Sequence, residues 1–255
     1  MRTITVVTAT RAEYGLLRPV VQKIAASDVL DLQLVVTGAH LCPRLGETVH
    51  EIEADGLPIA ARLPIFTDNA DEPVAKTIAR TMEIFDNHFA AHRPDAVLLL
   101  GDRFEIFAVA AAAAARHIPI AHISGGDVTL GAADEYYRHC ISKMAAVHFP
   151  SCADSAARLV RMGEAPDTVF CVGGLGDENI RTLPKMSREE LRKSTGFDLM
   201  QPFALVTYHP GDRPRRRLPR LCRCRRCVTL WPPWTACSGS SPGRTPTRAG
   251  RSAPP

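Results

Sequence analysis

The sequence has no apolar run near the roughly 18 to 20 residues that a membrane-spanning helix needs, although 45% of its residues are hydrophobic. Residues 3–7 are typical of a β-strand rather than of a signal peptide. The first four cysteines lack the spacing of a metal site, so we expect reduced thiols; they are Cys42, Cys140, Cys152 and Cys171. A cytoplasmic protein without a membrane partner is therefore predicted.

Residues 211–255 lack lysine, isoleucine, phenylalanine, asparagine and glutamate, and they carry eleven arginines against one acid. The rest of the chain has 20 basic and 26 acidic side chains, so the net charge of +4 combines −6 with +10. An arginine-rich arm for nucleic acid and a zinc module on Cys222, Cys224, Cys227 and Cys237 are two alternatives. Basic arms usually mix lysine with arginine, and zinc modules show strand and turn signals. We therefore favour translation of GC-rich DNA in a shifted frame, which predicts a non-native, disordered tail and no nucleic-acid partner.

Short apolar segments alternate with helical patterns through the rest of the chain. The predicted strands are 3–8, 31–37, 61–64, 96–100, 118–123, 147–150, 169–172 and 203–208, and the predicted helices are 14–26, 44–54, 73–92, 104–116, 134–146 and 151–161. This alternation predicts an α/β fold with a doubly wound, Rossmann-like parallel sheet. We expect a domain at 1–175, a bridge and the first strand of an incomplete second domain at 176–210, and the tail at 211–255.

Charged residues follow the most hydrophobic predicted strand directly. Asp102 and Arg103 come after residues 96–100, and Arg11 follows the first strand. Ligands of open α/β sheets bind at the carboxyl ends of the strands, where an arginine can grip a phosphate. Asp102 could instead cap the next helix. We favour function because several polar groups gather at strand ends.

A second polar segment follows the strand predicted at 118–123. Gly125 and Gly126 would let a backbone approach a ligand closely, and Asp127 follows them. Asp134 and Glu135 open the next helix, where first-turn charge is the structural alternative. A purely structural role for Asp134 and Glu135 does not explain why polar side chains and a Gly-Gly pair are concentrated at this edge of the sheet.

Three basic residues could complete this edge. Arg138 and His139 lie one turn into the helix and could turn inward, although a histidine there is more often structural. His209 ends the strand predicted at 203–208, where it could transfer a proton or hold a phosphate.

Three motifs together resemble the UDP-N-acetylglucosamine 2-epimerase family. They are Thr10-Arg11-Ala12-Glu13-Tyr14, Gly101-Asp102-Arg103-Phe104-Glu105, and the segment from His122 to Met144. The resemblance covers residues 1–210 and is greatest for the hydrolysing branch that feeds sialic and legionaminic acid synthesis. It implies the first half of a two-domain, glycosyltransferase-B-like architecture. Full-length relatives are expected to be homo-oligomers.

The chemistry that the resemblance implies is elimination of UDP from a UDP-sugar, followed by hydration of the resulting glycal. The product would be a 2-epimeric free amino sugar, ManNAc or a 2,4-diacetamido analogue. A carboxylate must remove the C2 proton while cationic groups stabilise the departing diphosphate. No metal or redox cofactor is needed.

Residue roles follow from the resemblance by motif position. The catalytic residues would be Asp102, Asp134 and His209, of which His209 lies near the phosphates. The substrate-binding residues would be Arg11, which contacts the diphosphate, together with Arg103, Gly125, Gly126, Asp127 and Glu135. Which carboxylate removes the proton is left open.

Two departures from the family pattern bear on function. Ser124 stands where some relatives have a glutamate, which widens the expected substrate to UDP-2,4-diacetamido sugars. The second domain is missing, so little or no turnover is expected of the chain as it stands. A non-hydrolysing epimerase, a glycosyltransferase of the same architecture, and a binding module for an acidic partner are the alternatives.

Overall fold

The computed structural model describes residues 1–182 and 184–196. Met1–Pro184 belongs to one compact unit, and the described residues 185–196 belong to a second. The strand predicted at 203–208, His209 and the tail at 211–255 lie outside the described residues. None of the described helices is long and apolar enough to cross a membrane.

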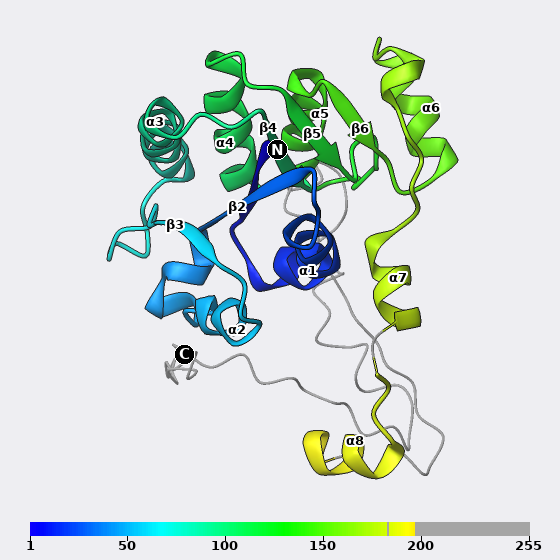
Figure 1. Ribbon diagram of the computed structural model, residues 1–255. Helices are drawn as coiled ribbons and strands as arrows, with labels where there is room; N and C mark the ends of the chain where they lie inside the picture. Colours follow the sequence, from blue (N-terminus) through cyan, green and yellow to red (C-terminus); the bar gives the residue numbers. More distant parts are fainter. Residues whose placement is uncertain (183, 197–255) are drawn as a thin grey trace, which may run out of the picture. The chain divides into compact units, whose positions relative to one another are not determined.

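Strands and helices alternate through the first unit (Figure 1). The strands are β1 (Arg2–Thr8), β2 (Leu30–Thr37), β3 (Ile59–Leu63), β4 (Ala96–Leu100), β5 (Ile120–Ile123) and β6 (Val147–Phe149). The helices are α1 (Arg11–Ala25), α2 (Val49–Ala54), α3 (Val74–Ala91), α4 (Phe104–Ala115), α5 (Asp134–Met144), α6 (Ala153–Arg161) and α7 (Leu175–Thr182). The second unit contains α8 (Arg188–Thr195), which begins with a capping box formed by Ser187 and Glu190.

The six strands form one sheet in the order β3-β2-β1-β4-β5-β6, and every neighbouring pair is parallel. The chain therefore starts in the middle of the sheet and winds outward in both directions. This confirms the predicted α/β class with a parallel sheet. The order reverses between β1 and β4, which makes this pair the switch point where open α/β sheets bind their ligands.

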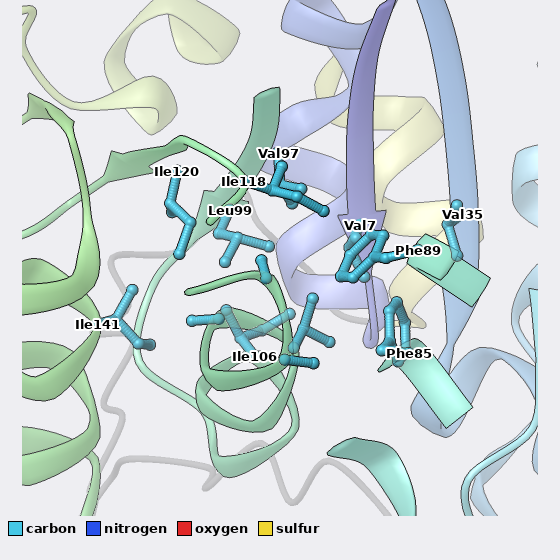
Figure 2. Packing of buried hydrophobic residues seen from close by; sticks show 14 of the residues in the cluster. Val7, Val35, Phe85, Phe89, Val97, Leu99, Ile106, Ile118, Ile120 and Ile141 are labelled. Atoms are coloured by element: carbon cyan, nitrogen blue, oxygen red, sulfur yellow. The ribbon is translucent and has the colours of Figure 1, made fainter. Parts of the chain in front are cut away.

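Alternate residues of the central strands build a separate core on each face of the sheet. Val7, Val35 and Leu99 belong to the core that α3, α4 and α5 cover. Figure 2 shows Phe85, Phe89, Ile106 and Ile141 packed against these strand residues. Val6, Leu34 and Leu98 face the other way, toward α1 and α2. Burial on both faces explains why these strands are continuously apolar in sequence.

The ends of several elements differ from the predictions. The strand predicted at 169–172 is wrong, because only a single bridge joins Val169 to His148. The helix predicted at 44–54 is broken: Gly46 has φ +100°, in the left-handed region, so Pro43–Leu45 forms a separate 3-10 turn. In contrast, α1 starts earlier than predicted because the capping box of Thr10 and Glu13 opens it at Arg11.

Helix α7 is part of the first compact unit, although the sequence placed it in a bridge after residue 175. The Asn179 amide donates a hydrogen bond to the Gly15 carbonyl of α1 at 2.8 Å. Leu175 packs against the core that α1 covers. The contact with α1 extends the unit to Pro184.

The cap of α1 generates a stability prediction. Thr10→Ala removes the hydroxyl that accepts from the Glu13 backbone N–H, so we expect the free energy of unfolding to fall by about 1 kcal/mol. Thr10→Ser keeps the hydroxyl and is expected to cost much less. Equilibrium denaturation in guanidinium measures both, and equal losses for the two variants would contradict the capping role.

Candidate functional site

The residues that follow β1 and β4 meet at the switch point of the sheet. The side chain of Glu13, in the first turn of α1, lies against that of Arg103, which precedes α4: Glu13 Oε1 and Arg103 Nε are 3.9 Å apart. Arg103 also donates a hydrogen bond to Glu105 at 2.8 Å. The loops after these two strands are therefore joined through one guanidinium.

Asp102 is not the cap of α4. The N-cap position belongs to Arg103, and no side chain bonds the first turn there. The turn at Gly101 (φ +83°) sends the Asp102 carboxylate toward α5 instead, where it accepts a hydrogen bond from Nη2 of Arg138. The carboxylate of Asp102, in the loop after β4, is thus paired with the guanidinium of Arg138, in α5.

Arg138 is the buried centre of this arrangement, with only 5% of its side chain exposed. Its Nη1 donates to the Asp127 carbonyl at 2.9 Å and to Glu135 at 3.0 Å, and its Nη2 also donates to the Thr129 hydroxyl at 2.7 Å. One guanidinium therefore fixes the end of β4, the loop after β5 and the start of α5.

Arg138 is predicted from the sequence only as a residue that could turn inward, and it is not among the predicted catalytic or substrate-binding residues. The spacing of Arg138, Ile141 and Ser142 could have indicated that Arg138 faces the protein interior. All three are buried, and together they define the inward face of α5. An arginine on an inward face needs acceptors, and the nearby acids Asp102 and Glu135 supply them.

Glu135 is held as a carboxylate by three donors. It accepts from the Thr129 backbone N–H at 2.6 Å, from Arg138, and from His139 at 3.3 Å. Burial raises the pKa of Glu135, but the bonds from Thr129 and His139 outweigh burial and lower its pKa overall. His139 therefore acts here as a partner of Glu135.

Asp134 links the start of α5 to the switch point. It is the first residue of α5, and its charge acts on Arg103 together with those of Glu105 and Glu13. We call Asp102, Arg103, Asp134, Glu135 and Arg138 the edge cluster. Four of these five were predicted site residues, and the fold brings them to one edge.

Gly125, Gly126 and Asp127 make close contacts within the protein. A Cβ at Gly126 would lie 2.4 Å from the Ser155 carbonyl of α6, and one at Gly125 would lie 2.9 Å from Nδ1 of His122. The Asp127 carboxylate accepts from the hydroxyls of Ser151 and Ser155 at 2.8 and 2.6 Å. Gly126 and Asp127 fasten the loop after β5 to the start of α6, whereas Gly125 packs against His122 of β5 and Ser142 of α5. Contact of the three residues with substrate stays a prediction.

His122 joins β5 to the turn after β4. Burial lowers its pKa to about 4, so the ring is neutral near pH 7, and its Nε2 donates to the Gly101 carbonyl at 2.8 Å. The contact fixes the turn that carries Asp102.

Arg11 lies at the same edge but outside the edge cluster. It is the first residue of α1, its side chain is 72% exposed, and its Nε lies 2.8 Å from Glu51 of α2. An exposed ion pair contributes little to stability, so an arriving anion can replace Glu51 as the partner of Arg11. Within the described residues, no group of three His, Cys, Asp or Glu side chains could hold a metal ion.

The family described as UDP-N-acetylglucosamine 2-epimerase matches residues 22–227. The chain is 41% identical over 211 residues to the UDP-N,N'-diacetylbacillosamine 2-epimerase (hydrolyzing) of Legionella pneumophila, covering 82% of this chain and 56% of that protein. It is 39% identical over 210 residues to the GDP/UDP-N,N'-diacetylbacillosamine 2-epimerase (hydrolyzing) of Campylobacter jejuni, covering 82% and 54%. The chain thus spans about half the length of these relatives.

Solved structures agree on the fold. The UDP-GlcNAc 2-epimerase from Neisseria meningitidis, solved with UDP-GlcNAc bound, matches with a TM-score of 0.64 at 21% identity, over 79% of this chain and 54% of that one. A structure from Listeria monocytogenes, titled as a UDP-N-acetylglucosamine 2-epimerase, matches with a TM-score of 0.66 at 22% identity, over 76% and 51%. Here too the chain corresponds to about half of each structure.

The contact between Gly126 and α6 generates a second prediction. Gly126→Ala adds both a positive-φ strain and a clash with Ser155, so we expect the free energy of unfolding to fall by about 3 kcal/mol or more. Gly131→Ala is the matched control, since Gly131 also has positive φ but no atom near its would-be Cβ. That control is expected to cost about 1 kcal/mol. If guanidinium denaturation shows the same loss of unfolding free energy for Gly126→Ala and Gly131→Ala, the close contact between Gly126 and α6 is contradicted.

Proposed function

The chain belongs to the UDP-N-acetylglucosamine 2-epimerase family, and we propose that its described residues form one half of the active site of a hydrolysing UDP-sugar 2-epimerase. The observation that carries this proposal is the edge cluster. It gathers the acids Asp102 and Asp134 with the arginines Arg103 and Arg138 at the carboxyl ends of β4 and β5. The hydrolysing activity named for the two relatives near 40% identity supports the same choice.

The proposed reaction begins with elimination. One carboxylate takes the proton from C2 of the sugar, the bond between C1 and the diphosphate oxygen breaks, and UDP leaves an unsaturated 2-acetamidoglucal. Water then adds across the double bond, with its oxygen bonding to C1 and a proton returning to C2 on the opposite face. The product is the free 2-epimeric sugar, and no electrons are exchanged with a second reactant.

Each residue of the edge has a place in this scheme. Asp102 and Asp134 are the acid and base candidates, because both are carboxylates placed beside cationic groups. Arg103 is half-buried and Arg11 is exposed, so their N–H groups can reach the leaving diphosphate. Arg138 orients Asp102, and Glu135 in turn fixes Arg138. His209 keeps its proposed place near the phosphates by motif position alone.

We propose a UDP-linked 2,4-diacetamido sugar as the preferred substrate. Ser124 cannot act as a carboxylate base, and it has φ +62° in the turn directly after β5. The names of both bacterial relatives specify a sugar with two N-acetyl groups.

The proposal is tested with a chimera of residues 1–210 joined to the part of the Legionella pneumophila relative that the match does not cover. We expect the chimera to release UDP and a free sugar from a UDP-diacetamido sugar. Asp102→Asn and Asp134→Asn are each expected to slow UDP release by about a hundredfold or more, because a neutral amide cannot accept the proton.

Asp86→Asn is the matched control for the chimera. Asp86 lies in α3, and the substitution also breaks a hydrogen-bonded pair between a carboxylate and an arginine. Its partner Arg116 is at the C-terminal end of α4, opposite Arg103. The UDP release of this variant should match that of the unmodified chimera. Recovery of an epimerised UDP-sugar instead of free sugar would identify the non-hydrolysing reaction and contradict the proposal.

The 255-residue chain by itself is expected to release no UDP above background, because the proposed site is completed by the other half of the family's architecture. A coupled assay for UDP on the purified chain measures this. Robust turnover would show that the described half is sufficient and would overturn the division of the site between two halves.

A further inference from the structure

Arg103 lies between two buried carboxylates at the switch point. Its Nη2 donates to Oε1 of Glu105 at 2.8 Å, and its Nε faces Oε1 of Glu13 at 3.9 Å. The side chains of Glu105 and Glu13 are 0% and 9% exposed, whereas that of Arg103 is 43% exposed. The guanidinium is therefore held on its buried side by the two carboxylates, and the rest of it is exposed to solvent.

Three polar atoms of this group have no hydrogen-bond partner within the described part of the chain. They are Oε1 of Glu13, Nε of Arg103 and Oε2 of Glu105, and all three are buried. Unsatisfied buried polar atoms are rare and costly, so their gathering at one point calls for an explanation beyond folding.

Glu13 cannot turn away from Arg103 without breaking the start of α1. Its second oxygen accepts from the backbone N–H groups of Ala9 and Thr10 at 2.9 and 3.2 Å. The carboxyl group is thus fixed by the capping box, and its free oxygen stays directed toward the guanidinium.

Glu13 is also able to change its protonation near neutral pH. Burial raises its pKa to about 7; Arg103 and the N–H groups of Ala9 and Thr10 lower it, and Glu105 raises it. Three carboxylates, those of Glu13, Glu105 and Asp134, act on the single charge of Arg103. Additional negative charge at this point would favour the protonated form of Glu13.

We propose that Glu13 and Glu105 are positioning residues that hold Arg103 for the diphosphate of the nucleotide sugar, and that Glu13 takes up one proton from solvent when the diphosphate binds. This inference rests on the proposed function. Glu105 keeps one N–H of the guanidinium, and the outward N–H groups meet the anion. The proton enters at Oε1 of Glu13, which is no longer needed as a counter-charge once the phosphates neutralise Arg103.

The linkage between anion and proton has a defined sign. A proton taken up on binding makes affinity highest where Glu13 is already protonated, below its pKa, and lower where it is ionised. If binding raises the pKa of Glu13 by about one unit, affinity falls about tenfold between pH 6 and pH 8.5.

The first experiment follows the Glu13 carboxyl carbon by NMR in the free 255-residue chain across a pH titration. Arg103→Met is expected to move the Glu13 midpoint upward, and Glu105→Gln is expected to move it downward. Asp86→Asn, in α3 and paired with Arg116 at the C-terminal end of α4, is the control and should leave the midpoint in place. If the Glu13 midpoint is the same in Arg103→Met, in Glu105→Gln and in the unmodified chain, the inference is overturned, regardless of which ligand binds at this edge.

The second experiment titrates the full chain with UDP-N-acetylglucosamine by NMR near pH 6 and near pH 8.5. This probe is chosen because its diphosphate does not change charge in that range. The unmodified chain should bind about tenfold more weakly at the higher pH. Glu13→Gln should bind with the same affinity at both, and Glu105→Gln should bind several-fold more weakly at both.

The outcomes separate the two proposals. Binding whose pH dependence survives Glu13→Gln would overturn the role of Glu13 and leave the proposed function standing. Unchanged affinity in Glu105→Gln would overturn its positioning role. Absence of any binding by this chain, with the Glu13 midpoints moving as expected, would reject the diphosphate as the ligand of Arg103, whereas the proposed function is decided by UDP release from the chimera.

Discussion

The pairing of Arg138 with Asp102 is the interaction on which the candidate site depends. A guanidinium that is almost fully buried cannot give up its charge, so it must satisfy its five donors inside the protein. Asp102, Glu135, Thr129 and the Asp127 carbonyl accept four hydrogen bonds from its Nη1 and Nη2. The direction of the Asp102 carboxylate is consequently set by the burial of a side chain from another element. Neither the loop after β4 nor α5 could hold that direction by itself.

The sheet brings this pair next to the second charged group. Because β1 and β4 are neighbours and run parallel, the loops that follow them share one edge, and Arg103 joins them through Glu13 and Glu105. Asp134 acts on the same guanidinium from the start of α5. Each arginine is therefore paired with its own set of acids, and Arg103 is the more exposed of the two.

Much of the fold and part of the site could be predicted from the sequence. Buried parallel strands are short continuous apolar runs, so β1, β2, β4 and β5 and the polar residues at their ends were found directly. The inward direction of Arg138 depended on which face of α5 packs against the sheet, and no local pattern names its acceptors. The packing of Gly125, Gly126 and Asp127 against β5 and α6 needed contacts between distant segments, so sequence suggested only a ligand. The segment predicted as a strand at 169–172 lies beside β6, but β6 ends at Phe149 and only one bridge forms, between Val169 and His148.

The crowding at Gly126 also constrains how sequences of this fold can diverge. The carbonyl of Ser155 occupies the volume of any side chain at residue 126, and the backbone there is in the left-handed region. A homologue with another amino acid at this position can therefore keep the loop only by displacing α6. Substitutions at residue 126 should then occur together with insertions before α6. An alignment of distant homologues would show whether these two kinds of change are found in the same sequences.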